Sequence, residues 1–174
     1  MKTTKVALIG FGTIGTAVGS IVAAMGMRVL GRAERRKAGL PFPVEWLPET
    51  ELFALADVIS LHTPLNEETR YTINTDTLRR VKRGVILINT ARGGLVDDAA
   101  LAEALRGGVV AAAALDVVGE AEPPEATNPL LSAPNCVITP HVAWATRASR
   151  QRCLQEAAAN LGAFVAGERR NRID

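Results

Sequence analysis

Aromatic residues and cysteines are scarce in this 174-residue chain, and each scarcity narrows the class of protein. Aromatic residues make up 4% of the chain, so aliphatic side chains must fill the core, which suits close packing of helices on a sheet. The two cysteines, Cys136 and Cys153, have no neighbours at the spacing of a metal site or a redox motif. They indicate a reduced intracellular protein with neither a disulfide framework nor a metal site.

Long apolar runs and an excess of one charge are also missing. The net charge of +2 gives no support for binding to nucleic acid or to an anionic membrane surface. The longest apolar stretch, around 108–118, is too short to span a membrane, and the N-terminus lacks the pattern of a signal peptide. We therefore expect a cytoplasmic protein that binds neither nucleic acid nor membrane. The length suits one domain, which we expect to cover residues 1–174.

Short apolar runs alternate with amphipathic segments along the chain. Strands are expected at 6–9, 28–30, 44–47, 58–61, 85–88, within 109–117, and at 136–139. Helices are expected at 13–25, 49–55, 75–81, 97–105 and 146–167, and a long proline-rich loop at 119–134. This alternation predicts an α/β fold, a Rossmann-type doubly wound parallel sheet with helices on both faces.

The segment GFGTIG joins the first expected strand to the first expected helix. Gly10 permits the tight turn, Gly12 lets the backbone approach a pyrophosphate, and Gly15 lets the helix pack closely on the strand. The first helical residues, Thr13 and Ile14, offer unpaired N–H groups to the phosphates at the positive end of the helix dipole. A glycine-rich turn alone is weak support, but between a strand and a helix it predicts binding of NAD or NADP.

The residues after the second strand bear on the choice of cofactor. Ala33 stands where such folds usually carry an acid that binds the ribose 2′-hydroxyl group. Arg32 precedes it, and three further basic residues follow: Arg35, Arg36 and Lys37. This arrangement favours a 2′-phosphate, and hence NADP over NAD. In the alternative interpretation the arginines lie on a solvated turn and Glu34 replaces the missing acid.

Later segments of the chain carry a family resemblance. VISLHTPLNEETRYTIN, GVILINTARGGLVDDAAL, AALDVVGEAEPP, NPLL and NCVITPHVAWAT occur in the order in which the D-2-hydroxyacid dehydrogenase family has them. The chain resembles this family over nearly its whole length. The PHVAWAT and EPP segments look most like the branch of glycerate dehydrogenases and hydroxypyruvate reductases.

The resemblance implies three catalytic residues, Arg92, Glu122 and His141. Arg92 would hold the carboxylate of a 2-oxo acid and polarise its carbonyl group. His141 would donate a proton to the carbonyl oxygen as hydride is transferred, and Glu122 would orient the imidazole ring. Glu120 is a rival for the last role, because the loop is about one residue longer than the family pattern. Independently, all three residues follow expected parallel strands, at the edge where ligands bind in such sheets.

Further positions are implied by the resemblance. Trp144 would form a wall of the substrate pocket, or simply pack, and Asp116 would bind the carboxamide of the nicotinamide. Additional cofactor contacts would come from two segments: His62, Thr63, Pro64 and Thr69 in one, and Thr90 and Ala91 in the other.

Family members carry a segment before the GFGTIG strand that forms most of a substrate domain and helps to build a dimer. The chain is expected to lack this substrate domain, either as a fragment or as a natural short form. The resemblance implies an NAD(P)H-dependent oxidoreductase that acts on a small 2-oxo or D-2-hydroxy acid, such as hydroxypyruvate or glyoxylate, with a homodimer as a further expectation. The alternatives are a co-repressor-like interaction module that binds the nucleotide, and a cofactor-binding fragment without turnover.

Overall fold

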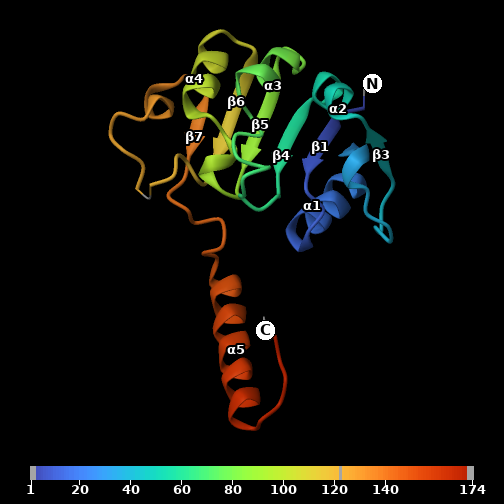
Figure 1. Ribbon diagram of the computed structural model, residues 1–174, viewed down its shortest axis with the longest axis vertical. Coiled ribbons are helices and arrows are strands. Elements are labelled where there is room, and N and C mark those ends of the chain that lie inside the picture. Colours follow the sequence, from blue (N-terminus) through green and yellow to red (C-terminus); the bar gives the residue numbers. More distant parts are fainter. Residues whose placement is uncertain (1–2, 122, 172–174) are drawn as a thin grey trace. The chain divides into compact units, whose positions relative to one another are not determined.

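The fold is built around one parallel β-sheet, seen in a computed structural model that describes residues 3–121 and 123–171 (Figure 1). The sheet has seven strands in the order β3-β2-β1-β4-β5-β6-β7, and every neighbouring pair is parallel. The strands are β1 (Lys5–Ile9), β2 (Arg28–Arg32), β3 (Val44–Leu47), β4 (Val58–Leu61), β5 (Val85–Asn89), β6 (Val110–Leu115) and β7 (Cys136–Ile138). The strand order reverses between β1 and β4, so a ligand crevice is expected at the carboxyl ends of these two strands.

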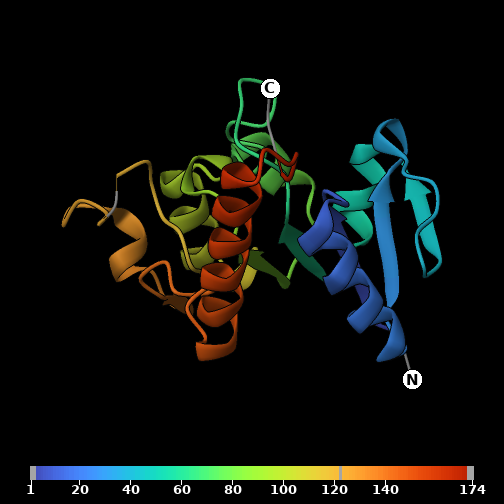
Figure 2. The same cartoon turned by 90° about the horizontal axis from the view of Figure 1, so that it is seen from below.

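Helices cover both faces of the sheet (Figure 2). These helices are α1 (Thr13–Ala24), α2 (Glu49–Leu55), α3 (Thr75–Arg80) and α4 (Asp98–Arg106). A fifth helix, α5 (Arg147–Val165), follows the last strand in the chain. On one face, Ala7 and Ile9 of β1 belong to a large apolar cluster with residues of α2, α3 and α4. On the other face, Val6 and Leu8 pack in a smaller cluster with residues of α1. Alternate residues of a strand therefore support opposite layers.

Short polar side chains mark where several helices begin. Asn74 and Thr77 form a reciprocal capping box at the start of α3, with N···O distances of 2.8 and 3.0 Å. Asp97 accepts hydrogen bonds from two backbone N–H groups of the first turn of α4. In contrast, α1 begins at Gly12 with no side-chain cap, which leaves its first N–H groups available to a ligand.

The sequence predicts the α/β fold and its helices on both faces correctly, and the boundaries differ by a few residues. Strand β2 continues to Arg32, two residues beyond the expected end, because it pairs with β3 as far as Arg32↔Leu47. The proline-rich loop contains a short 3-10 helix, η3 (Pro129–Ser132), capped by the side chain of Asn128. Two further 3-10 turns, η1 (Ala33–Arg35) and η2 (Gly93–Leu95), follow β2 and β5.

The chain divides into two compact units at the Pro140–His141 peptide bond. The first unit holds the sheet and α1 to α4, and the second holds α5. Thr146 caps α5, and its hydroxyl group accepts a hydrogen bond from the backbone of Ser149 at 3.2 Å. The single domain expected over residues 1–174 stays a prediction.

Candidate nucleotide-binding and catalytic site

The glycine loop has the geometry that a phosphate site needs. Gly10 has a φ of +113°, and a Cβ atom there would lie 2.6 Å from the carbonyl oxygen of His62. At Gly15 a Cβ atom would lie 2.2 Å from the carbonyl oxygen of Gly10, so only glycine lets α1 approach this closely. A Cβ atom at Gly12 would meet no atom within 4 Å. The space beside Gly12 is therefore open for a ligand at the helix N-terminus.

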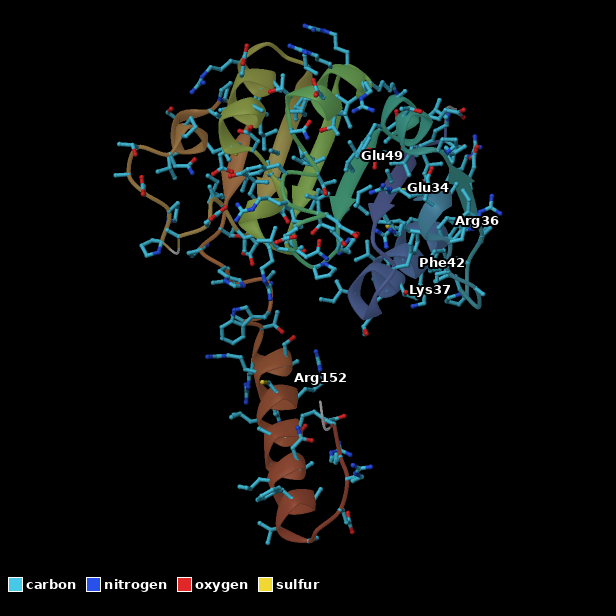
Figure 3. The ribbon with its side chains drawn as sticks, viewed as in Figure 1. Glu34, Arg36, Lys37, Phe42, Glu49 and Arg152 are labelled. Atoms are coloured by element: carbon cyan, nitrogen blue, oxygen red, sulfur yellow. The ribbon has the colours of Figure 1, made fainter. Side chains whose placement is uncertain are left out.

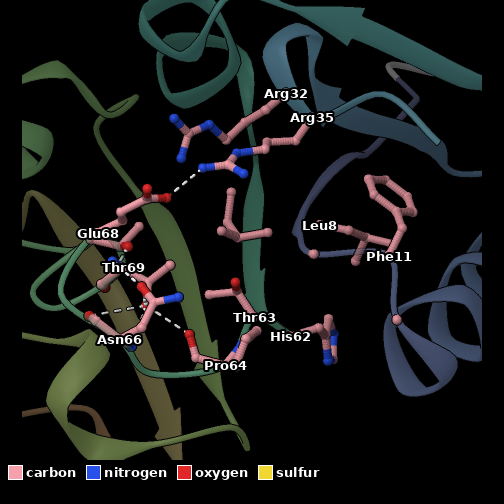
Figure 4. A pocket seen from close by; sticks show the side chains of 14 residues that line it. Leu8, Phe11, Arg32, Arg35, His62, Thr63, Pro64, Asn66, Glu68 and Thr69 are labelled. Carbon is pink, nitrogen blue, oxygen red and sulfur yellow. Dashed lines mark hydrogen bonds and ion pairs between the residues drawn. The ribbon is translucent and has the colours of Figure 1, made fainter.

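A cavity of about 540 Å³ starts at this loop, a size typical of sites for small ligands (Figure 4). Seven of the expected cofactor-binding residues line it: Gly10, Gly12, Arg32, His62, Thr63, Pro64 and Thr69. The cavity thus joins residues after β1, β2 and β4, at the point where the strand order reverses. Thr13, Ile14 and Gly15 lie outside this lining, in the first turn of α1.

Two ion pairs stand where the chain leaves β2. The guanidinium group of Arg32 lies 2.7 Å from the carboxylate of Glu49. That of Arg35 lies 2.7 Å from the carboxylate of Glu68 (Figure 4). The Nε atom of Arg32 is buried and has no hydrogen-bond partner among the described residues. An unpaired donor at the edge of a cavity suits a ligand that brings an acceptor.

The other charged residues after β2 lie outside the lining of the cavity. Glu34, Arg36 and Lys37 are all exposed in the segment that follows β2 (Figure 3). The ammonium group of Lys37 donates a 2.7 Å hydrogen bond to the carbonyl oxygen of Phe11, which ties the turn after β2 to the glycine loop. Glu34 does not line this cavity, and its role as a replacement for the missing acid stays a prediction.

The segment after β4 is held in place by its own hydrogen bonds. The hydroxyl group of Thr69 donates to the carbonyl oxygen of Pro64 at 2.6 Å and accepts from the backbone N–H group of Asn66 at 2.8 Å. At the start of the segment, Nε2 of His62 lies 2.9 Å from the hydroxyl oxygen of the buried Ser60. Burial lowers the pKa of His62, which favours the neutral ring beside the cavity.

Arg92 follows β5, in a turn ordered by Asn89. The fully buried amide of Asn89 accepts from the N–H group of Ala91 at 3.0 Å and donates to the carbonyl oxygen of Arg92 at 2.9 Å. Arg92 itself is exposed, as is Thr90, and it donates only a 2.6 Å bond to the carbonyl oxygen of Ala91 among the interactions described. Its side chain is therefore accessible to a ligand.

Three acidic candidate residues follow β6: Asp116, Glu120 and Glu122. Asp116 is buried and accepts a 2.5 Å hydrogen bond from the hydroxyl group of Thr139, which follows β7. Glu120 forms an ion pair with Arg70. Glu122, the preferred candidate for the residue that orients the histidine, lies outside the described residues.

His141 and Trp144 belong to the second compact unit. The indole N–H group of Trp144 donates to the carbonyl oxygen of His141 at 2.8 Å, and 58% of the Trp144 side chain is exposed. His141 has a φ of +52°, a left-handed conformation that is unusual for a residue with a side chain. Such backbone strain is enriched at functional sites.

Sequence reasoning missed several residues that line the cavity. Asn66, Glu68 and Thr72 come from the segment after β4, Leu8 comes from β1, and Phe11 comes from the glycine loop. Asn66, a residue type that favours turns, is a local signal that could have indicated the turn there. No local pattern indicates that Glu68 reaches Arg35.

Comparisons with known proteins agree with this geometry. Residues 1–143 match the family profile described as "D-isomer specific 2-hydroxyacid dehydrogenase, NAD binding domain". The chain is 42% identical over 170 residues to a glycerate dehydrogenase of Methylorubrum extorquens, covering 96% of this chain and 52% of the relative. It is 43% identical over 161 residues to a hydroxypyruvate reductase of Blautia hydrogenotrophica, covering 92% and 50%.

A solved structure shows the same fold. The D-lactate dehydrogenase of Lactobacillus jensenii, determined with NAD+, superposes with a TM-score of 0.87 at 34% identity, over 98% of this chain and 55% of that one. The fold and the glycine loop define a Rossmann-type NAD-binding domain. The chain belongs to the D-isomer-specific 2-hydroxyacid dehydrogenase family, and it spans about half the length of the relatives that it matches.

Two further properties concern residues 3–121 and 123–171, the part of the chain that the structure describes. No helix there is long and apolar enough to cross a membrane. In the same residues, no group of three or more His, Cys, Asp or Glu side chains is arranged to hold a metal ion.

Proposed function

We propose that this chain is the cofactor-binding part of an NAD(P)H-dependent oxidoreductase that converts a 2-oxo acid to a D-2-hydroxy acid, with hydroxypyruvate or glyoxylate as the substrate. The observation that carries the proposal is the cavity that starts at the open space beside Gly12, at the reversal of strand order. The names of the glycerate dehydrogenase and hydroxypyruvate reductase relatives support the choice of substrate.

The residues present fit a dinucleotide. The uncapped N-terminus of α1 would bind the pyrophosphate through the N–H groups of Thr13 and Ile14, with the dipole of the helix adding to the attraction. Thr63 and Pro64 would contact the adenosine half, and Arg32 a 2′-phosphate. Thr90, Ala91 and the buried Asp116 follow β5 and β6 and would hold the nicotinamide half. Bound nicotinamide supplies the hydride.

The substrate would be held by Arg92. A guanidinium group forms two parallel hydrogen bonds with a carboxylate, so it fixes the orientation of the 2-oxo acid. The turn ordered by Asn89 positions the backbone of Arg92 and leaves its side chain exposed. Arg92 would therefore bring binding energy and a positive charge near the carbonyl oxygen, where negative charge develops during reduction.

Proton transfer would fall to His141. Its protonated ring would donate to the carbonyl oxygen, and its neutral ring would accept the proton in the reverse reaction. Glu122 would accept a hydrogen bond from the other ring nitrogen and so fix the orientation of the ring. Trp144 would exclude water from the substrate side.

An assay of turnover tests the proposal. The chain alone and the chain joined to the substrate domain of a relative are each mixed with hydroxypyruvate and reduced cofactor, and oxidation of the cofactor is followed by absorbance. We expect turnover in the joined protein and little in the chain alone, since an open site admits water and leaves the substrate without one wall. Cofactor binding without turnover in the joined protein would favour a nucleotide-binding interaction module instead.

Arg32 tests the preference for NADP. We expect NADPH to bind more tightly than NADH, and Arg32→Ala to narrow the difference by roughly tenfold, because a charge-assisted hydrogen bond contributes on the order of 1.5–3 kcal/mol. Calorimetric titration of both cofactors into the two proteins measures the effect. Arg36→Ala is the matched control, since Arg36 lies outside the cavity lining. Equal affinities in the unmodified protein would contradict the preference.

Two glutamates compete for the role of orienting His141. Glu120 already forms an ion pair with Arg70, so its carboxylate has a partner elsewhere. In the joined protein we expect Glu120→Gln to change the rate less than about threefold, in line with the small energies of exposed ion pairs. Glu122→Gln should move the loss of reductive activity to lower pH, because a protonated imidazole ring loses its anionic partner. Rate profiles against pH separate the two residues, and a shift in Glu120→Gln alone would reverse the assignment.

The homodimer and the cytoplasmic location suggested by the sequence stay predictions.

A further inference from the structure

Four charged side chains near the end of β2 form two ion pairs, which differ in how exposed they are. In the inner pair, 31% of the Arg32 side chain and 30% of the Glu49 side chain are exposed. In the outer pair, the exposed fractions are 69% for Arg35 and 72% for Glu68. Arg32, Arg35 and Glu68 all line the cavity that begins at the glycine loop.

The outer pair is the one that a ligand can open. Ion pairs between exposed side chains contribute little stability, because water solvates both charges when they separate. Breaking the inner pair would leave two partly buried charges without a partner, which costs more. An anion that enters this end of the cavity will therefore bind Arg35, and the ion pair between Arg35 and Glu68 will break.

The backbone that carries Glu68 is held in place. Thr69, the next residue, donates to the carbonyl oxygen of Pro64, and its N–H group donates to the side chain of Asn66 at 3.0 Å. These bonds keep the Glu68 carboxylate on the β4 side of the cavity, opposite Arg35 on η1 (Figure 4). Ala33 stands where such folds usually carry an acidic residue after β2. Glu68, from the segment after β4, supplies an acidic group in its place.

We propose that Glu68 is a specificity-determining residue that sets the balance between NADH and NADPH in this cavity. With NADH, the carboxylate accepts a hydrogen bond from the ribose 2′-hydroxyl group while it stays paired with Arg35. With NADPH, the 2′-phosphate takes the place of the Glu68 carboxylate beside Arg35. The displaced carboxylate and the phosphate are both negatively charged, so they repel each other. This proposal rests on the proposed function, in that the cavity must hold the adenosine half of the cofactor.

The test compares two neighbouring glutamates. Glu68→Gln removes the charge and keeps the shape of the side chain, and Glu67→Gln makes the same change at an exposed residue outside the cavity lining. NADH and NADPH are titrated into each protein, and the ratio of their dissociation constants is measured. We expect Glu68→Gln to shift the ratio toward NADPH by roughly tenfold, and Glu67→Gln to leave it unchanged.

A second pair of variants shows whether the effect passes through Arg35. In an Arg35→Ala background the shift caused by Glu68→Gln should fall to about threefold or less, because the freed cation is gone and only repulsion remains. An unchanged ratio in Glu68→Gln, or an equal shift in Glu67→Gln, would overturn the proposal. Failure of the proposed function gives other results: the unmodified chain would bind neither cofactor, or the chain joined to a substrate domain would bind cofactor without turnover.

Discussion

Gly12→Val is expected to weaken the binding of NADH and NADPH by at least about a hundredfold while leaving the melting temperature nearly unchanged. The loss corresponds to two charge-assisted hydrogen bonds between the backbone and the pyrophosphate, each on the order of 1.5–3 kcal/mol. The fold should tolerate the change, because Gly12 has an extended backbone with a φ of −68° and a Cβ atom there meets nothing within 4 Å. The added side chain fills only the space reserved for the ligand.

Gly15→Ala provides the contrasting control. Its Cβ atom would lie 2.2 Å from the carbonyl oxygen of Gly10, so the helix must move away from the strand. We expect this variant to lose both melting temperature and cofactor affinity. Calorimetric titration and thermal unfolding of both variants give the comparison. If Gly12→Val keeps its affinity, the phosphate is not bound at this loop.

His141→Ala is expected to lower the rate of 2-oxo acid reduction by about 10²–10⁴, the usual contribution of a positioned general acid. The measurement uses the chain joined to a substrate domain, at saturating cofactor and substrate. The dissociation constant of the cofactor should stay within about threefold of its original value, because the cofactor contacts proposed above come from the first compact unit and His141 belongs to the second. The effect therefore belongs to the chemical step.

Added imidazole gives an independent test of the same role. A small base that diffuses into the space left by the ring should restore part of the lost rate, and the restored rate should depend on its protonated fraction. A loss of less than tenfold in His141→Ala, or no rescue with an intact fold, would remove His141 from the role of proton donor.

The sheet and most of its helices could be predicted because their signals are local. The expected strand at 58–61 and the expected helix at 49–55 coincide with β4 and α2. In both segments the spacing of apolar residues and the flanking turn residues indicate the same element. The glycine loop could also be predicted, since Gly10 and Gly15 are required by close contacts with His62 and with Gly10 itself, and Gly12 leaves an open space. Its surrounding cavity includes seven of the expected cofactor-binding residues.

The parts that escaped prediction depend on residues far apart in the chain. Arg35 meets Glu68 across 33 positions, and Thr139 meets Asp116 across 23. No periodicity or turn signal encodes such pairs, because they exist only once β2 and β4, or β6 and β7, lie in the same sheet. The strand expected at 28–30 was too short for the same reason, because pairing with β3 extends β2 to Arg32.

The unequal packing of the two faces has a consequence for the lifetime of the protein in a cell. The cluster beneath α1 has five buried residues among those described, Val6, Leu8, Phe11, Val29 and Phe42, whereas the opposite cluster is far larger. Segments with few buried contacts open locally at low free energy, and proteases attack such open forms. A ligand that binds only the closed form adds about 2.7 kcal/mol at a hundred times its dissociation constant. Since the N–H groups proposed to bind the pyrophosphate belong to α1, we expect bound cofactor to slow degradation of the protein.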